Sequence, residues 1–255
     1  MNVFGEYSRY YDLLYRDKDY KAEADFVAGL ILRYMPHAST ILDLGCGTGI
    51  HASFLVQNGY TVCGLDFSEE MLKSAQERRS SLSRELASRL EFLHGDVRTI
   101  RLNRQFDVVI SLFHVMSYQT TNEDLLAAFK TVREHLRPAG IFIFDCWYAP
   151  AVLTEKPSVR IKRLEDDEVF LTRIAEPKIH PNENTVNVYY QTFIRNKKNA
   201  RTQELQEMHC MRYLFKPEIQ FLCSLHNLEV VDHGEWKSWR EPGFDTWSVC
   251  FVVRG

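Results

Sequence analysis

Short apolar runs alternate with segments of helical periodicity along the first 150 residues of the chain. The runs are continuously apolar, which is typical of strands buried on both faces of a parallel sheet. The segments between them repeat apolar residues every three or four positions, as amphipathic helices do. This rhythm predicts a doubly wound, Rossmann-like α/β fold. Strands are expected at 40–44, 60–66, 90–96, 106–113 and 141–145, and helices at 22–34, 51–58, 122–136 and directly after Ser68.

The rhythm changes after Pro150. Three segments mix polar and apolar side chains at a period near two, as half-buried antiparallel strands do. These segments are 169–174, 185–194 and 204–215. The charged run 163–168 before them is expected to be a solvated turn. The pattern predicts an antiparallel β lobe inserted after the fifth strand of the main sheet.

The last part of the chain returns to the earlier pattern and is expected to complete a seven-stranded, mostly parallel sheet. Its expected elements are a helix at 217–226 and a hairpin of 229–231 with 246–253. Residues 1–150 and 216–255 are therefore expected to form the core, and residues 151–215 the lobe.

The composition narrows the classes of function. Of 255 residues, 45% are hydrophobic and 25% charged, and the net charge is −3, so no nucleic-acid partner is expected. Six cysteines are scattered without a C-x-x-C pair, which argues against a zinc site. No apolar run reaches about 18 residues, the length that a membrane span needs. Residues 1–7 lack the pattern of a signal peptide, so a reduced cytoplasmic protein without a membrane partner is expected.

Three glycines, Gly45, Gly47 and Gly49, alternate in the turn after the first strand. Glycine permits positive φ and a close backbone approach to a ligand, and doubly wound sheets bind ligands beyond the carboxyl ends of their strands. The spacing differs from the G-x-G-x-x-G of dinucleotide-binding proteins. Asp43, just before the turn, would repel a pyrophosphate but suits a ligand with an ammonium group. A nicotinamide-dependent oxidoreductase is therefore disfavoured.

Acidic residues also end the next two strands. Asp66 closes the second strand, where a carboxylate can accept hydrogen bonds from both ribose hydroxyls. Asp96 closes the third strand, where it can accept from an adenine amino group. Together with Asp43, they predict a site for a nucleoside that carries an ammonium group.

At these residues the chain resembles the class I S-adenosylmethionine-dependent methyltransferases, and the resemblance covers 40–145. It implies S-adenosyl-L-methionine as the cofactor. Carried over by position, the methionine end falls on Asp43, Gly45, Cys46, Gly47, Thr48 and Gly49. The ribose falls on Asp66 with its neighbour Phe67, the adenine on Met71, Asp96 and Val97, and the reactive methyl beside Leu112 and Phe113.

The segment from Tyr10 to Tyr20 and the lobe after Pro150 resemble those of nucleotide-linked amino-sugar N-methyltransferases. This resemblance implies a small-molecule acceptor with an amino group on such a sugar. It also implies that tyrosines close over the cofactor, which here would be Tyr11 and Tyr20. Aromatic packing of an N-terminal helix is the simpler interpretation of both residues.

The catalytic group is less well defined. The family places a histidine on the loop after the fourth strand, whereas this chain has Tyr118 at the nearest matching position and His114 earlier in the loop. His209, on the last strand of the lobe, is a third candidate. An O-methyltransferase that uses Tyr118 or His209 as base, and a protein that binds the cofactor without turnover, remain alternatives. The sequence leaves open whether the chain forms a homodimer.

Overall fold

The computed structural model describes residues 10–255, so the expectation for residues 1–7 lies outside the described range. Its centre is a parallel sheet with the strand order β3-β2-β1-β4-β5, in which the chain crosses over between β1 and β4. These strands are β1 (Thr40–Leu44), β2 (Thr61–Asp66), β3 (Leu90–His94), β4 (Phe106–Ser111) and β5 (Leu136–Tyr148). The predicted doubly wound α/β core is confirmed. The crossover brings the carboxyl ends of β1, β2 and β4 together at one edge.

The C-terminal hairpin extends this sheet on the far side of β5, as predicted. Strand β11 (Ser248–Arg254) pairs antiparallel with β5, and β10 (Glu229–Glu235) pairs antiparallel with β11. The sheet is mixed rather than purely parallel. Trp236 and Trp239, which follow β10, pack against Phe26 of the core and not against the cavity described below.

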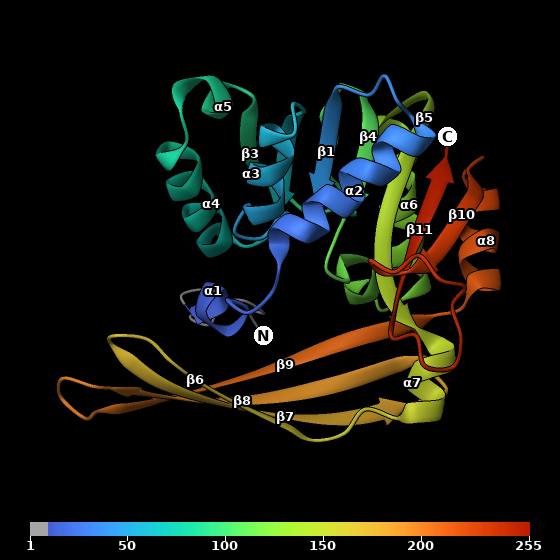
Figure 1. The fold of residues 1–255 in the computed structure, drawn as a ribbon. Helices are drawn as coiled ribbons and strands as arrows, with labels where there is room; N and C mark the ends of the chain where they lie inside the picture. Colours follow the sequence, from blue (N-terminus) through green and yellow to red (C-terminus); the bar gives the residue numbers. More distant parts are fainter. Residues whose placement is uncertain (1–9) are drawn as a thin grey trace.

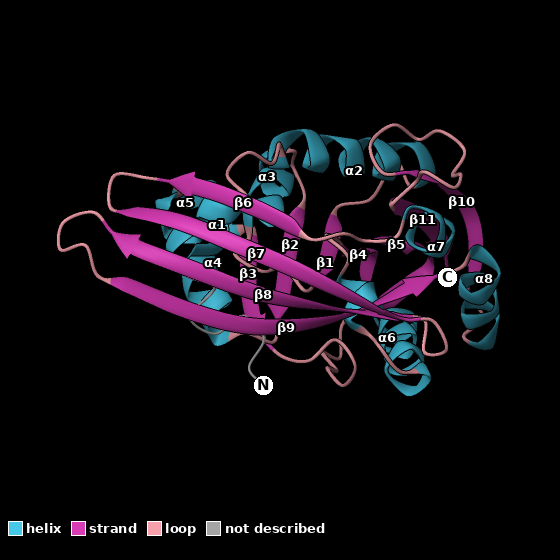
Figure 2. Cartoon of the chain, turned by 90° about the horizontal axis from the view of Figure 1, so that it is seen from below, coloured by secondary structure: helices cyan, strands magenta, loops and turns pink. Residues whose placement is uncertain are grey.

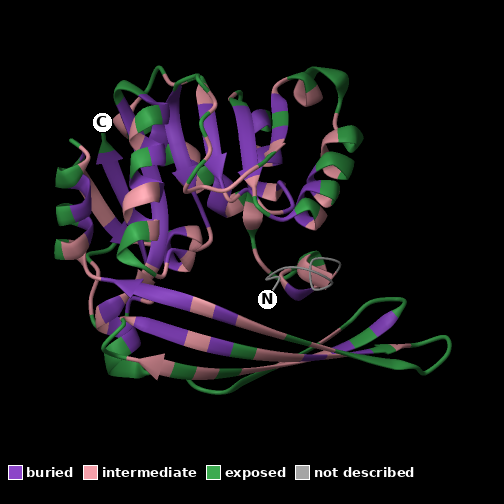
Figure 3. Cartoon of the chain, turned by 180° about the vertical axis from the view of Figure 1, so that it is seen from behind, coloured by how far each residue is buried: buried purple, intermediate pink, exposed green. Residues whose placement is uncertain are grey.

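Helices cover both faces of the core sheet, and each face has its own apolar cluster. On one face lie α2 and α3, and on the other α6 and α8. In Figure 3 the core strands are almost continuously buried, which explains their unbroken apolar sequence. The core helices are α2 (Tyr20–Tyr34), α3 (Ile50–Gln57), α4 (Glu69–Ser81), α5 (Arg84–Ser88), α6 (Asn122–His135) and α8 (Lys216–Leu225).

Four long antiparallel strands form the lobe, which lies beyond the carboxyl ends of the core strands (Figures 1 and 2). They are β6 (Arg160–Glu165), β7 (Val169–His180), β8 (Thr185–Asn196) and β9 (Thr202–Leu214). The short helices α1 (Tyr11–Leu14) and α7 (Ala149–Glu155) lie next to the lobe (Figure 1). The predicted antiparallel lobe is confirmed, but with one strand more than the sequence indicated.

The structure corrects three details of the prediction. Residues 160–165 form β6, so the charged run 163–168 is only in part a turn; its alternating charges lie on an edge strand where they stay hydrated. Strand β5 begins at Leu136 rather than at the expected residue 141, and its pairing register with β4 shifts in this added part. The sheet also has more strands than the expected seven, because Trp147 and Tyr148 of β5 pair with Tyr213 and Leu214 of β9. Core and lobe strands thus join into one 11-stranded sheet.

No helix within residues 10–255 combines the length and the apolar character that crossing a bilayer would need.

Candidate active site

A cavity of about 690 Å³ lies where the carboxyl ends of the core strands face the lobe and α1. Residues from distant parts of the chain line it, including the glycine turn and strands β8 and β9. Of the residues predicted from sequence, only Gly49 is absent from its wall. The predicted residues that line it are Tyr11, Tyr20, Asp43, Gly45, Cys46, Gly47, Thr48, Asp66, Phe67, Met71, Asp96, Val97, Leu112, Phe113, His114, Tyr118 and His209.

The turn after β1 needs its glycines. Gly45, Gly47 and Gly49 have φ values of 82°, 55° and 73°, in the left-handed region that favours glycine. A Cβ atom on Gly45 would lie 2.6 Å from a methyl group of Val115, and one on Gly49 would lie 2.5 Å from the Phe92 ring. Gly49 therefore serves the packing of the turn at the start of α3, while Gly45 and Gly47 face the cavity.

Asp43 lies on β1 at the base of the cavity and is only 2% exposed. Burial, with a smaller contribution from the charge of Asp66, raises its pKa from an ordinary 3.8 to about 7. A buried carboxylate is costly unless a cation or hydrogen-bond donors accompany it. The position is therefore suited to a positively charged ligand group.

The carboxylate of Asp66 ties the glycine turn to the end of β2. It accepts hydrogen bonds from the backbone N–H groups of Gly47, at 2.7 Å, and Ser68, at 2.9 Å. Burial raises the pKa of Asp66, although these hydrogen bonds act in the opposite direction. A carboxylate has about four acceptor positions, so Asp66 can hold the turn and still accept from hydroxyl groups of a ligand.

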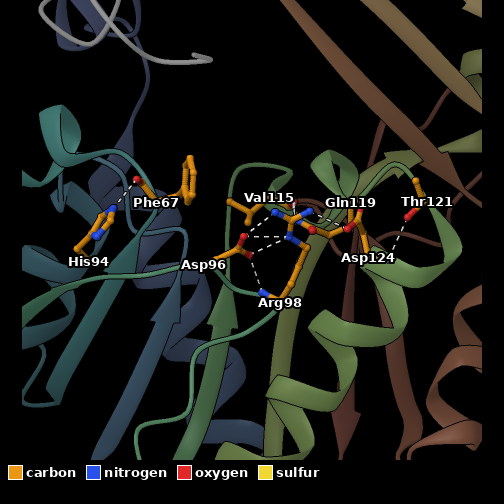
Figure 4. Close-up of polar contacts among 8 residues, drawn as sticks. All are labelled: Phe67, His94, Asp96, Arg98, Val115, Gln119, Thr121 and Asp124. Carbon is orange, nitrogen blue, oxygen red and sulfur yellow. Dashed lines mark hydrogen bonds and ion pairs between the residues drawn. The ribbon is translucent and has the colours of Figure 1, made fainter. Parts of the chain in front are cut away.

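Asp96 forms an ion pair that the sequence did not predict (Figure 4). The guanidinium of Arg98 donates to both carboxylate oxygens of Asp96, and a third nitrogen of Arg98 donates to Asp124 at 2.7 Å. These hydrogen bonds lower the pKa of Asp96, so it stays ionised and keeps its acceptor character. Arg98 also lines the cavity and fixes the orientation of the carboxylate there.

The N-terminal segment is attached to the glycine turn through Asp12. One oxygen of Asp12 accepts from the Thr48 hydroxyl at 3.0 Å, and the other accepts from Arg78 of α4 at 2.8 Å. The ring of Tyr11 meets Phe113 edge to face at 6.5 Å between centroids. Helix α1 thus lies beside the cavity next to the glycine turn, and Tyr11 and Tyr20 both line that cavity.

A buried charged cluster supports Tyr20. Lys18 lies 2.9 Å from Glu23, which also contacts His51 at 2.8 Å. The Lys18 ammonium is 3.5 Å from the centre of the Phe113 ring, within the range of a cation–π contact. Burial lowers the pKa of Lys18 and raises that of Tyr20. The cluster fixes the N-terminal segment against the loop that follows β4.

The loop after β4 has an unusual backbone. Phe113 and His114 are consecutive non-glycine residues with φ values of 63° and 65°. Such residues are strained and persist only where the surroundings hold them, often at functional sites. Here Asp145 holds the loop: its carboxylate accepts from the His114 backbone N–H at 3.2 Å and lies 2.7 Å from Nδ1 of the same residue. Burial acts to raise the pKa of Asp145, but the contacts with His114 act in the opposite direction and the pKa is lowered.

The other two catalytic candidates meet directly. The Tyr118 hydroxyl lies 2.8 Å from Nδ1 of His209, and Nε2 of His209 lies 3.0 Å from the Glu207 carboxylate. Tyr118 comes from the short 3-10 helix Val115–Tyr118, whereas His209 and Glu207 come from β9. His114 is not part of this chain of contacts, because its side chain pairs with Asp145.

Further residues line the cavity that the sequence did not single out. The lobe strands supply Arg160, Tyr190 and Met211, and the core supplies Ile50, His51, Ser68, Arg98, Val115, Gln119 and Trp147, together with Tyr15 after α1. Tyr190 could have been found by alternation, because cross-strand pairing sets it opposite Glu207, two residues from His209. The others lie on β5, β6, β9, α3 or the connecting segments, and the local sequence pattern does not show that they face a common cavity.

Comparison with known proteins gives a consistent result. Residues 41–140 match a methyltransferase domain family. The chain is 38% identical to a dTDP-3-amino-3,4,6-trideoxy-alpha-D-glucopyranose N,N-dimethyltransferase from Streptomyces venezuelae, over 57% of this chain and 59% of that protein. It is 30% identical to a dTDP-3-amino-3,6-dideoxy-alpha-D-glucopyranose N,N-dimethyltransferase from Streptomyces fradiae, over 73% of this chain and 70% of that protein.

Solved structures extend the similarity to nearly the whole chain. An S-adenosylmethionine-dependent methyltransferase from Clostridium acetobutylicum aligns with a TM-score of 0.81 and 25% identity over 99% of both chains. DesVI from Streptomyces venezuelae aligns with a TM-score of 0.80 and 26% identity, also over 99% of both. The lobe is therefore shared with these structures. The chain belongs to the S-adenosylmethionine-dependent methyltransferase family that includes the dTDP-amino-sugar N,N-dimethyltransferases.

Proposed function

We propose that the protein transfers methyl groups from S-adenosylmethionine to the amino group of a nucleotide-linked sugar. The observation that carries this proposal is the single cavity bounded on one side by the glycine turn and on the other by the lobe. A cofactor at the turn would present its methyl group toward residues of the lobe, and methyl transfer mainly requires such alignment of nucleophile, methyl and sulfur. Two relatives of this chain are named as N,N-dimethyltransferases of dTDP-linked amino sugars.

The cofactor would extend from β1 toward β3. Asp43 would accept from the ammonium group of the methionine moiety, and the burial and raised pKa of its carboxyl group support this assignment. Asp66 would accept from the ribose hydroxyls, and Asp96 from the adenine amino group. Tyr11 and Tyr20 would close over the methionine end. The remaining contacts would come from Gly45, Cys46, Gly47, Thr48, Phe67, Met71, Val97, Leu112 and Phe113, with Gly49 supporting the turn.

The acceptor would bind on the lobe side, with Tyr118, His114 and His209 as the candidate catalytic residues. Arg160 of β6 lines the cavity, and a guanidinium there is suited to the diphosphate of a sugar nucleotide. Tyr15 and Tyr190 provide aromatic surface beside it. Because the relatives are named N,N-dimethyltransferases, we propose that the same nitrogen accepts two methyl groups in succession.

A panel of acceptors tests the proposed class of substrate. The purified protein is incubated with S-adenosylmethionine and, separately, a dTDP-linked amino sugar, the same amino sugar without nucleotide, glycine and a short peptide. The proposal predicts the highest kcat/KM for the dTDP-linked amino sugar, with mono- and dimethylated products in sequence by mass spectrometry. A preference for glycine or the peptide N-terminus would contradict the assignment to sugar nucleotides.

Two alternative functions make different predictions. An O-methyltransferase would modify hydroxy sugars through Tyr118 or His209 as base, and would ignore the amine. A protein that only binds the cofactor would bind S-adenosylhomocysteine in calorimetry but show no transfer to any acceptor. Binding of NAD instead of S-adenosylhomocysteine would contradict methyl transfer and favour a nicotinamide-dependent oxidoreductase.

We also propose that residues 1–150 and 216–255 bind the cofactor while residues 151–215 bind the acceptor, in a cytoplasmic protein with no nucleic-acid or membrane partner. The net charge of −3 supports the absence of a nucleic-acid partner. Exposed apolar residues on the lobe, such as Val159, Ile161 and Phe170, support a homodimer through that face. Sedimentation velocity distinguishes the dimer from a monomer.

A further inference from the structure

We propose that Glu207 orients His209 so that Tyr118 and His209 together remove a proton from the acceptor amine. This proposal rests on the proposed amine methylation, and it assigns a role to Glu207. The three side chains form a continuous path from the cavity wall into β9: Tyr118 Oη to His209 Nδ1 at 2.8 Å, and His209 Nε2 to the Glu207 carboxylate at 3.0 Å. The His209 side chain is 4% exposed and that of Glu207 is 10% exposed, so both contacts are shielded from water.

The chemistry of the carboxylate fixes the direction of these hydrogen bonds. An ionised carboxylate only accepts, so Nε2 of His209 must carry the proton that it shares with Glu207. A neutral imidazole with a proton on Nε2 has an unprotonated Nδ1, which accepts from Tyr118. The Tyr118 hydroxyl then donates its single proton in the hydrogen bond to His209. Toward any other group it can act only as a hydrogen-bond acceptor. Glu207 thus makes Tyr118 an acceptor on its cavity side.

An acceptor on the cavity wall suits an amine substrate. An ammonium N–H can donate to Tyr118 Oη; as that N–H bond breaks and a new Oη–H bond forms, the original Tyr118 proton moves to Nδ1 of His209. The amine nitrogen keeps the electron pair and becomes the nucleophile. The product of the step is an imidazolium beside the Glu207 carboxylate, a charge pair that a neutral residue at 207 would not provide. Between the two transfers the imidazolium of His209 must return its proton through Tyr118 to water in the cavity; the same path can then take a proton from the monomethylated ammonium, as a second methylation requires.

The charged and titratable neighbours of this path come from three other elements. Tyr190 of β8 packs its ring edge against His209 at 4.9 Å, and Arg173 of β7 lies 4.9 Å from the Tyr190 ring. Tyr15, after α1, also faces Arg173. Burial raises the pKa of Tyr190 to about 12 and also raises that of Tyr118 well above its ordinary value, so both phenols are neutral near neutral pH. The step therefore transfers a proton through a neutral phenol and forms no free tyrosinate.

Two substitutions at 207 separate the role of the charge from that of the hydrogen bond. Glu207→Leu removes both, whereas Glu207→Gln keeps an acceptor for Nε2 of His209 without the charge. We expect kcat to fall on the order of ten- to a hundredfold for Glu207→Leu and less for Glu207→Gln, with KM for the acceptor little changed. In Glu207→Gln the acidic limb of the kcat profile should move to lower pH, because loss of a nearby negative charge disfavours the protonated imidazole.

The matched control is Glu204→Gln, on the exposed part of the same strand, where the carboxylate accepts hydrogen bonds from Gln191 and Gln206. It should leave kcat and the pH profile unchanged. Thermal unfolding of each variant verifies the fold. Activity of Glu207→Leu equal to that of Glu204→Gln, with the same acidic limb, would overturn the proposal.

A measurement without catalysis distinguishes this proposal from the proposed function. In protein with ¹⁵N-labelled histidine, NMR should show His209 protonated on Nε2 and unprotonated on Nδ1, and Glu207→Leu should alter this pattern while Glu204→Gln should not. A proton on Nδ1 of His209 in the wild-type protein would refute the role of Glu207 whatever the acceptor is. Absence of transfer to any amine, with the expected tautomer intact, would refute the amine-methylating function and leave the orienting role of Glu207 supported.

Discussion

Asp43 and Asp66 place two carboxylates at the ends of neighbouring strands, within one cavity and with a raised pKa. Burial is the main cause for both, and their mutual repulsion adds to it at Asp43. Backbone hydrogen bonds offset part of the cost of burying Asp66, whereas no comparable compensation reaches Asp43 from residues 10–255. A ligand ammonium group would supply this compensation. Asp43, whose burial destabilises the protein without cofactor, is therefore well suited to bind the cofactor.

The pKa of Asp43 leads to a prediction about pH. If the cofactor ammonium binds the ionised form, affinity for S-adenosylhomocysteine should rise with pH up to about 7, by up to roughly tenfold per unit, and level off above it. Binding below pH 7 should release a proton, which calorimetry in buffers of different ionisation enthalpy detects. The Asp43→Asn variant should bind weakly and without this pH dependence. Affinity that stays constant from about pH 5 to about pH 8, a range that includes the pKa of Asp43, would contradict the assignment.

The same group makes the empty protein less stable as pH rises. Its folded pKa of about 7 exceeds the ordinary 3.8, so between these values the folded protein binds a proton that the unfolded chain has released. The contribution of Asp43 to the free energy of unfolding therefore falls as pH rises through this window. Denaturant titrations of wild-type protein and Asp43→Asn should converge toward pH 4 and diverge toward pH 7, with the variant the more stable at pH 7.

Asp66 allows a test of the ribose contact. Asp66→Ala should weaken S-adenosylhomocysteine binding by about 2–4 kcal/mol, because it removes charge-assisted hydrogen bonds to two hydroxyls and also frees the glycine turn. Asp167→Ala, in the exposed turn between β6 and β7, is a control that should bind normally. Calorimetry measures both. An unchanged affinity for Asp66→Ala would remove Asp66 from the cofactor site.

At the scale of elements, the glycine turn and helix α3 depend on close packing. Gly49→Ala places a methyl group 2.5 Å from Phe92 and 3.1 Å from Ala75 at a positive φ, so it should lower the free energy of unfolding by about 1–3 kcal/mol. Gly47→Ala meets no atom within 4 Å and carries only the backbone penalty of about 1 kcal/mol. Equal losses of stability in the two variants, measured by denaturation, would show that packing against Phe92 is not the cause.

The core elements could be predicted from the sequence because burial on both faces leaves an unmistakable apolar run, as in β4. The acidic strand ends and the glycine turn were predictable for a related reason: their positions follow from the order of strands. Strand β6 was not, since its charged residues lie on an exposed edge. The pairing of β5 with β9 could not be predicted from the sequence either, because pairing between distant segments depends on packing that a local sequence pattern does not contain.

The Asp96–Arg98–Asp124 ion pairs and the Tyr118–His209–Glu207 contacts were missed for the same reason. Each joins segments that the chain separates by many residues: Arg98 and Asp124 lie 26 apart, and Tyr118 and His209 lie 91 apart. The sequence indicated Tyr118 and His209 as separate candidates, and only the fold shows that they touch. The residue types at strand ends can thus be predicted from the local sequence, whereas the residues that they contact cannot.

Arg212 connects β9 to two core helices and tests the union of lobe and core. Its guanidinium donates to Glu218 of α8, Asn122 of α6 and the Thr120 carbonyl. Arg212→Ala removes the donor to Glu218 and to the Thr120 carbonyl, which are both half-buried, and should lower the free energy of unfolding by about 2–3 kcal/mol. Arg201→Ala, in the exposed turn before β9, is the control and should have little effect. A loss that is no larger for Arg212→Ala than for the control would contradict this role.

At the scale of the whole molecule, the single cavity follows from the continuity of the sheet. The core supplies the glycine turn and three acidic residues, and the lobe supplies Arg160, Tyr190 and His209 across from them. Because β5 pairs with both β11 and β9, the two halves of the site are fixed by one strand. Residues 41–140 on the cofactor side match a methyltransferase domain family, and we propose that the lobe side determines which acceptor binds.

The most direct test of amine methylation uses two acceptors that differ in one group: a dTDP-linked amino sugar and the same sugar nucleotide with a hydroxyl in place of the amine. Each is incubated with S-adenosylmethionine labelled with ¹³C at the methyl group, and NMR identifies the atom that receives the label. The account predicts label on nitrogen in the amino sugar and none in the hydroxy analogue. Label on oxygen, or no transfer to the amino sugar by protein that binds S-adenosylhomocysteine, would contradict it.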